Sequence, residues 1–145
     1  MKTFISILFI TILLIACQNT NQEIKDSNEK TAIDIVDLYY KSLNNKNYET
    51  MYSLISEGFK QIEPTAKDYQ TFELYMKRFS NSFESVEAKD IRLVESSADA
   101  AKVSYNMFLK PKNVEMQQLN LTTELKIKNN EWKMIHPYSN KIDES

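Results

Sequence analysis

The sequence predicts an α+β domain in which N-terminal helices pack on one face of an antiparallel sheet. Apolar residues recur every three or four positions from about residue 29 to residue 83, which is typical of amphipathic helices. After about residue 85 they recur at every second position, which is typical of strands with one buried face. Because the helices precede the strands instead of alternating with them, an α+β domain is expected rather than a parallel α/β sheet.

The amino-acid composition excludes several classes of function for this domain. A chain of 145 residues with 42% apolar residues fits one domain, and its net charge of −2 argues against a nucleic-acid partner. One cysteine rules out an internal disulfide, and one histidine rules out a multi-histidine metal centre. One glycine rules out a glycine-rich phosphate loop. We therefore expect no cofactor and no metal.

The first seventeen residues have the layout of a secretory signal. Lys2 precedes an apolar run to Ala16, and this run is shorter than the roughly 20 residues that span a bilayer. The run ends in Leu14-Ile15-Ala16-Cys17, which resembles the lipobox of bacterial lipoproteins. The resemblance implies that the Cys17 thiol receives a diacylglyceryl group and that Cys17 becomes the first residue of the mature protein. The alternative is an incidental cysteine after an ordinary signal.

This resemblance divides the chain into three parts and gives it a location. Residues 1–16 are the expected signal peptide, residues 17–28 the lipidated cysteine with a polar tether, and residues 29–145 the folded domain. The membrane is then a partner through the lipid on Cys17, and the cell envelope is the expected location. Gln18 stands where an aspartate tends to retain lipoproteins in the inner membrane, so a diderm cell would place this protein in the outer membrane.

Three helices are expected in the first part of the domain. The first covers about residues 29–44, and the second begins near Tyr48 and ends at Gly58, because glycine tolerates the left-handed conformation of a helix C-cap. Pro64 and Thr65 are expected to open the third. The apolar positions of the first helix are Ala32, Ile33, Val36, Tyr39, Tyr40 and Leu43. Those of the third are Tyr69, Phe72, Met76, Phe79 and Phe83.

Four strands are expected after the helices. The first lies near residues 91–94 and the second over residues 103–109, before Pro111. The third has the clearest alternation, over residues 119–127, and the fourth covers residues 131–136. A two-residue turn, Asn129-Asn130, joins the last two strands because asparagine accepts positive φ better than most residues. The sheet has one apolar face, which the helices must cover.

The two ends of the domain resemble a known family. Residues 32–56, AIDIVDLYYKSLNNKNYETMYSLIS, resemble the opening helices of nuclear transport factor 2-like domains. Residues 121–138, LTTELKIKNNEWKMIHPY, resemble the long strand, tight turn and Trp-Lys strand that close them. The resemblance implies a curved antiparallel sheet wrapped around helices as a cone whose open end often holds a pocket. The lumazine-binding-like subgroup of uncharacterised function, often secreted or lipid-anchored, is the one this chain resembles.

The sequence offers few candidate catalytic residues. His136 is the only histidine, and a general base needs an orienting partner that no spacing in the sequence supplies. Asp34 and Asp37 lie three apart on the first helix, where a solvated face explains them. An acidic stretch near the start of the sheet matches no calcium-loop spacing. We therefore assign no catalytic residue.

Tyrosines are the more informative set, because each combines a large apolar body with one polar tip. The candidate pocket-lining residues are Tyr39, Tyr40, Tyr52, Tyr75, Tyr105 and His136. Packing within the core is the alternative explanation for the tyrosines. The leading hypothesis is a lipid-anchored, non-enzymatic domain that binds a small molecule or an envelope protein. Two alternatives stay open: a cone-fold enzyme of the isomerase or dehydratase type, and a structural subunit that forms a homodimer through its sheet.

Overall fold

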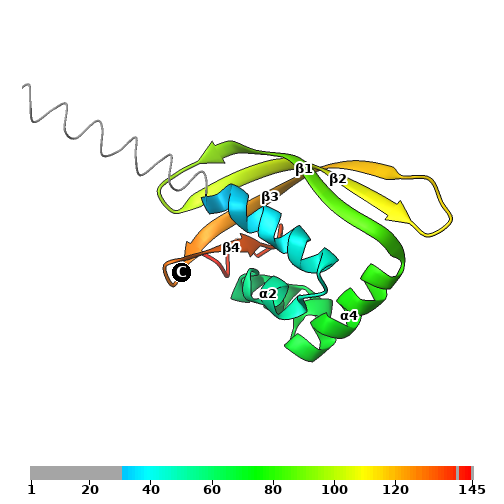
Figure 1. The fold of residues 1–145 in the computed structure, drawn as a ribbon. Coiled ribbons are helices and arrows are strands. Elements are labelled where there is room, and N and C mark those ends of the chain that lie inside the picture. The colour runs from blue at the N-terminus through cyan, green and yellow to red at the C-terminus, as the bar shows by residue number, and fades with distance from the viewer. Residues whose placement is uncertain (1–30, 140, 145) are drawn as a thin grey trace, which may run out of the picture.

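The computed structural model describes residues 31–139 and 141–144, and it confirms the α+β architecture. A four-stranded antiparallel sheet in the order β1-β2-β3-β4 curves over the helices, as Figure 1 shows. The signal peptide and tether expected over residues 1–28 lie outside the described residues.

The helices form the layer under the sheet. The chain is helical from residue 31, where the description begins, to residue 44. Three further α-helices follow: α2 (Tyr48–Ser53), α3 (Glu57–Ile62) and α4 (Tyr69–Asn81). Each begins at a polar N-cap whose side chain accepts a hydrogen bond from a backbone N–H in the first turn. These caps are Asn47, Ser56 and Asp68.

The third predicted helix starts later than the sequence predicted. Pro64 and Thr65 lie in the separate 3₁₀ turn Pro64–Ala66, and α4 begins only at Tyr69, after the N-cap Asp68. Of its predicted core-facing residues, Phe72, Met76 and Phe79 pack in or against the core. Tyr69 is exposed, and Phe83 is already the first residue of β1. Proline is well suited to either start, so the local pattern did not separate the turn from the helix.

The predicted role of Gly58 as the end of the second helix is wrong, because Gly58 lies inside α3. It lies in the first turn of α3 without a positive φ, and an additional helix therefore stands where the sequence predicted a helix end. A Cβ at position 58 would lie 2.3 Å from Oδ2 of Asp143. That carboxylate accepts hydrogen bonds from Ser56 Oγ at 2.9 Å, from the Gly58 N–H at 3.2 Å and from Ser139 Oγ at 2.6 Å. The glycine is needed for close approach, not for backbone conformation.

The sheet is longer than the sequence predicted at its first strand. β1 runs over Phe83–Ser96, about eight residues before the expected start. The pairing with β2 shifts between Lys89 and Arg92, and Asp90 within this stretch has a φ of 53°. A bulge of this kind breaks the alternation of apolar residues, which hides the strand from a period-two pattern.

The remaining strands agree with the predicted pattern. They are β2 (Ala100–Pro111), β3 (Gln117–Lys128) and β4 (Glu131–Ile135). Asn129 and Asn130 have φ values of 53° and 63°, which confirms the two-residue turn with positive φ at both positions.

Both edges of the sheet are partly covered by backbone or side-chain hydrogen bonds. At β4, the Met134 N–H donates to the Leu54 carbonyl at 2.8 Å, and the Ser56 N–H donates to the Met134 carbonyl at 3.0 Å. At β1, the Asn44 amide bonds both backbone groups of Val86, donating to its carbonyl at 2.6 Å. Covered edges are less prone to pair with another chain.

The core lies between the inner face of the sheet and the helices. Val36 on the first helix, Val103 on β2 and Leu125 on β3 are fully buried there. The outer face of the sheet carries the alternate residues of each strand, such as Lys102 and Glu124, which lie opposite one another across β2 and β3. No helix of the described residues is long and apolar enough to cross a membrane.

Candidate functional site

A group of tyrosines from different elements meets at the core, where Tyr105 is buried and Tyr39 and Tyr40 are partly buried. Tyr39 and Tyr40 are adjacent on the helix over residues 31–44, and Tyr105 lies on the inner face of β2. The ring centroids of Tyr39 and Tyr40 are 5.5 Å apart in an edge-to-face arrangement, and those of Tyr40 and Tyr105 are 5.4 Å apart. Tyr75 lies on α4 and is 43% exposed, so it does not belong to this group. We call Tyr39, Tyr40 and Tyr105 the interior tyrosine cluster.

The hydroxyl groups of this cluster continue into a chain of hydrogen bonds. Tyr40 Oη and Tyr105 Oη share a hydrogen bond of 2.9 Å, and Tyr105 Oη and Thr123 Oγ1 share one of 3.0 Å. Thr123 lies on β3 directly opposite Val103, on the same face as the tyrosines. The polar tips of two tyrosines are therefore satisfied inside the protein, as buried hydroxyls require.

Burial controls the electrostatics of the cluster. It raises the pKa of Tyr40 well above the usual value for tyrosine, and the neighbouring Tyr105 hydroxyl raises that pKa further. Burial also raises the pKa of Tyr39, with smaller contributions from Tyr105 and Tyr75. Both phenols are neutral at physiological pH, so they can donate and accept hydrogen bonds but cannot act as general bases.

Tyr52 belongs to a different place from the other candidate tyrosines. It lies on α2, where its ring packs at 5.7 Å from that of Tyr69 and at 5.4 Å from that of Phe72. Lys60 Nζ lies 4.5 Å from the centre of the Tyr52 ring. This arrangement joins α2, α3 and α4, and Tyr52 is therefore not grouped with the interior tyrosine cluster.

His136 follows β4 and meets a carboxylate that the sequence could not point to. Its Nε2 lies 3.9 Å from Oε2 of Glu63, which is 73 positions earlier in the chain. Its ring stands edge-to-face on Phe59 at 5.1 Å, and its Nδ1 accepts a hydrogen bond from the Tyr138 N–H at 3.2 Å. An accepting Nδ1 places the proton of neutral His136 on Nε2, facing Glu63. Hydrogen bonds from Thr65 lower the pKa of Glu63, and His136 adds to this effect.

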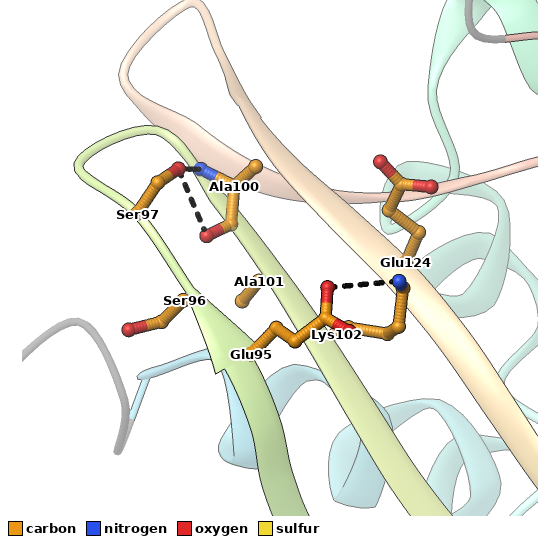
Figure 2. A pocket seen from close by; sticks show the side chains of 7 residues that line it. All are labelled: Glu95, Ser96, Ser97, Ala100, Ala101, Lys102 and Glu124. Atoms are coloured by element: carbon orange, nitrogen blue, oxygen red, sulfur yellow. Dashed lines mark hydrogen bonds and ion pairs between the residues drawn. The ribbon is translucent and has the colours of Figure 1, made fainter.

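Five hollows of about 200 to 470 Å³ on the surface of the described residues have no tyrosine in their lining. Figure 2 shows the hollow of about 200 Å³ beside the turn from β1 to β2. There Lys102 Nζ donates to Glu95 Oε2 at 2.9 Å, and this bond raises the pKa of Lys102. A reactive lysine needs a lowered pKa, so this hollow carries a surface ion pair rather than a nucleophile.

Comparison with known families decides what kind of domain this is. A family model of the SnoaL-like domain matches residues 33–139, which is most of the chain. The chain belongs to the SnoaL-like domain family. The match includes the interior tyrosine cluster, Thr123, Glu63 and His136.

Solved structures of related shape support the same fold. A candidate scytalone dehydratase from Novosphingobium aromaticivorans matches this SnoaL-like domain with a TM-score of 0.58 at 11% identity, over 78% of this chain and 83% of that one. A nuclear transport factor 2-like protein of unknown function from Shewanella oneidensis gives 0.57 at 10% identity, over 73% and 93%. A candidate dehydratase of that family from Streptomyces avermitilis gives 0.55 at 13% identity, over 76% and 92%. No curated protein matches the chain. At such low identities the likeness shows the fold alone.

The remaining candidates of this SnoaL-like domain fall outside the interior. Cys17 and Gln18 lie outside the described residues. In the acidic stretch on β1, Glu87 pairs with Lys89 at 2.7 Å, and Asp90 accepts a hydrogen bond from Asn106. Within the described ranges, no group of three or more His, Cys, Asp or Glu side chains is arranged to hold a metal ion.

Thr123 and Glu63 are the site residues that the sequence prediction missed. Thr123 occupies an inward position in the alternation of β3, and a hydroxyl on an otherwise apolar face was a visible signal for a buried polar contact. Glu63 gave no such signal, because its contact with His136 depends on how α3 packs on the end of β4.

Proposed function

We propose that this chain is a lipid-anchored, non-enzymatic binding domain of the cell envelope, and that its partner is another envelope protein. The observation that carries the non-enzymatic role is the chain of hydrogen-bonded hydroxyls from Tyr40 through Tyr105 to Thr123. In the enzymatic members of this fold, the resemblance places acid–base residues at the corresponding interior. Here the groups that meet are two phenol hydroxyls and a threonine hydroxyl.

Packing of the interior favours a protein partner over a small ligand. Tyr40 and Tyr105 occupy the space between the first helix and the sheet, and each fills it with an aromatic ring. The five surface hollows lie elsewhere, and small-molecule sites are normally concave and enclosed. A domain whose interior is filled by side chains binds a partner through its surface.

The anchor rests on the lipobox that ends at Cys17. Two or three acyl chains on one cysteine hold a protein on a bilayer, because each buried methylene contributes about 0.8 kcal/mol. Mass spectrometry of the protein purified from its native membranes is expected to show a mature chain that begins at Cys17 and carries diacylglyceryl. The Cys17→Ser variant is expected to lack lipid and to leave the membrane fraction. A variant that still floats with membranes and still carries lipid contradicts the anchor.

Native mass spectrometry also tests the kind of partner. Protein released gently from native membranes is expected to show the mass of the chain without a retained small molecule. A stoichiometric small molecule that survives release contradicts the choice of a protein partner. The matched variant Tyr105→Phe decides whether such a molecule lies in the interior, because only an interior ligand loses contact with that hydroxyl.

One arrangement favours an enzyme as the second candidate function, namely the approach of His136 to Glu63. A histidine whose Nε2–H faces a carboxylate takes up a proton on Nδ1, and in His136 that nitrogen must first release the Tyr138 N–H. Removal of a proton next to a carbonyl is a reaction that such a base performs. The assay is exchange of such protons for deuterium in a panel of cyclic ketones, followed by NMR. We expect no exchange beyond that of a His136→Gln control. Exchange that this control abolishes contradicts the non-enzymatic role.

A further inference from the structure

The β2–β3 hairpin exposes three large apolar side chains in its turn and at the start of β3. Val114, Met116 and Leu119 lie within six residues and are 52%, 59% and 42% exposed. Lys110 Nζ donates to the Val114 carbonyl at 3.2 Å, which ties the base of the turn together. We call Val114, Met116 and Leu119 the hairpin-tip patch. Large apolar side chains gathered on a surface mark a site of interaction.

The position of this patch relative to the N-terminus of the domain suggests what covers it. Figure 1 shows the helix over residues 31–44 starting at the end of the sheet that holds the β1–β2 turn, with the β2–β3 turn at the opposite end. Strand β2 joins these two ends with 12 residues, which span about 40 Å at the usual rise of a strand. The patch is therefore a contact point well separated from the place where the N-terminal segment enters the domain.

The length of chain before the domain allows both points to reach one surface. Residues 18–30 lie between Cys17 and the first described residue, and such a segment reaches at most about 45 Å when fully extended. This length is comparable to the separation of the two ends of the sheet. The domain can therefore lie along the membrane that holds its anchor, with the hairpin-tip patch against the same bilayer.

Charge around the patch fits an anionic bilayer surface. Lys110 on β2 and Lys112 just after it both precede the patch, Glu115 is the single carboxylate between residues 110 and 119, and Glu84 on β1 shares a surface hollow with Lys112. Lysines beside exposed apolar side chains suit the headgroup region, because their stems stay in apolar surroundings while the ammonium group reaches the phosphates. A short apolar tip with two lysines at its base matches an interfacial contact rather than a membrane span.

We propose that the hairpin-tip patch is a second membrane contact, which inserts into the headgroup region of an anionic phospholipid bilayer and holds the domain along its surface. This inference rests on the lipid anchor of the proposed function. Neither the interior tyrosine cluster nor His136 takes part in it.

The test places one fluorescent reporter at the patch in the full lipidated chain. Lipidation consumes the thiol of Cys17, so the only free thiol of a Met116→Cys variant is at the patch. The variant is purified from membranes, labelled with an environment-sensitive maleimide and reconstituted into vesicles of phosphatidylethanolamine and phosphatidylglycerol with brominated acyl chains. Leu74→Cys and Leu38→Cys are matched controls, because these apolar residues are 52% and 42% exposed but lie on α4 and on the helix over residues 31–44.

We expect a blue shift and several-fold stronger quenching by brominated lipid at position 116 than at either control position. Adding Val114→Ser to the labelled variant is expected to reduce that quenching. Equal quenching at all three positions, or none at position 116, overturns the proposal. A blue shift without quenching shows burial against protein, such as a second copy of the chain, and overturns the lipid as the occupant.

The outcome separates this inference from the anchor on which it rests. A wild-type chain that takes up the maleimide has a free thiol at Cys17, which contradicts the anchor and with it the two-point attachment. A wild-type chain that takes up none, combined with an unquenched reporter at position 116, leaves the anchor intact and overturns the membrane contact alone.

Discussion

The carboxylate of Asp143 occupies the space that a side chain at position 58 would need. Its Oδ2 lies 2.3 Å from the site of a Cβ at Gly58, and the same carboxylate binds the Gly58 N–H and the hydroxyls of Ser56 and Ser139. The single glycine of the chain thereby joins the C-terminal segment to the first turn of α3. Figure 1 shows the C-terminal segment close to β4 at this end of the molecule.

Gly58→Ala is expected to destabilise the domain by about 1–3 kcal/mol, the usual effect of adding a carbon to a tightly packed site. Urea unfolding followed by circular dichroism measures this change. Asp143→Ala removes the atoms that the new methyl group would meet. The loss caused by Gly58→Ala should therefore largely disappear in the Asp143→Ala background. Equal losses in both backgrounds would show that this contact is not responsible.

Tyr105→Phe is expected to destabilise the domain more than Tyr40→Phe, because Tyr105 is the middle member of the hydroxyl chain. Its removal deprives both Tyr40 and Thr123 of a hydrogen-bond partner, which costs about 1–3 kcal/mol for buried groups. Tyr39→Phe is the matched control, because no hydrogen bond of the Tyr39 hydroxyl is found among the described residues. Unfolding midpoints in urea rank the three variants, and a reversed order for Tyr105 and Tyr40 contradicts the chain.

Alkaline pH is expected to destabilise the domain through Tyr39 and Tyr40. Their pKa values are raised in the folded protein, whereas in the unfolded chain both phenols lose their protons near pH 10. Above that pH the unfolded state binds fewer protons than the folded state, so the free energy of unfolding falls as pH rises.

Unfolding in urea between pH 8 and pH 11 measures this dependence. The Tyr40→Phe variant should show a shallower decline than the wild-type chain, because one raised pKa is gone. Tyr138→Phe removes an 83% exposed tyrosine hydroxyl and is the control. An unchanged slope in Tyr40→Phe would contradict the role of the buried phenol.

Acid is expected to act through Glu63, whose pKa is lowered mainly by hydrogen bonds from Thr65. A lowered carboxyl pKa contributes stability above the unfolded-state value near 4.5, and this contribution is lost as pH falls through the folded value. The Glu63→Gln variant should lose less stability than the wild-type chain over that acidic range. Thermal unfolding at pH 3 to 7 compares the two. Glu84→Gln serves as the control, because Glu84 lies exposed on β1, away from this contact.

Local patterns were sufficient for most of the secondary structure. The alternation of β3 and the positive φ of Asn129 and Asn130 are properties of neighbouring residues, so the strand and its turn were predictable. The start of β1 was not, because the irregular pairing around Asp90 interrupts the alternation. The separate helix α3 was not predictable either. Its N-cap Ser56 and its Gly58 both donate hydrogen bonds to the carboxylate of Asp143, which lies 85 residues after the glycine.

The sequence by itself determined the fold class and the candidate tyrosines, because periodicity and residue type are local quantities. Only the tertiary structure decided which tyrosines meet. It joins Tyr39, Tyr40 and Tyr105 across the helix and β2, and it places Tyr52 against Tyr69 instead. It also brings Glu63 to His136. The physical reason is that such contacts depend on how a helix packs on a curved sheet, and residues distant in the chain come together only after that packing forms.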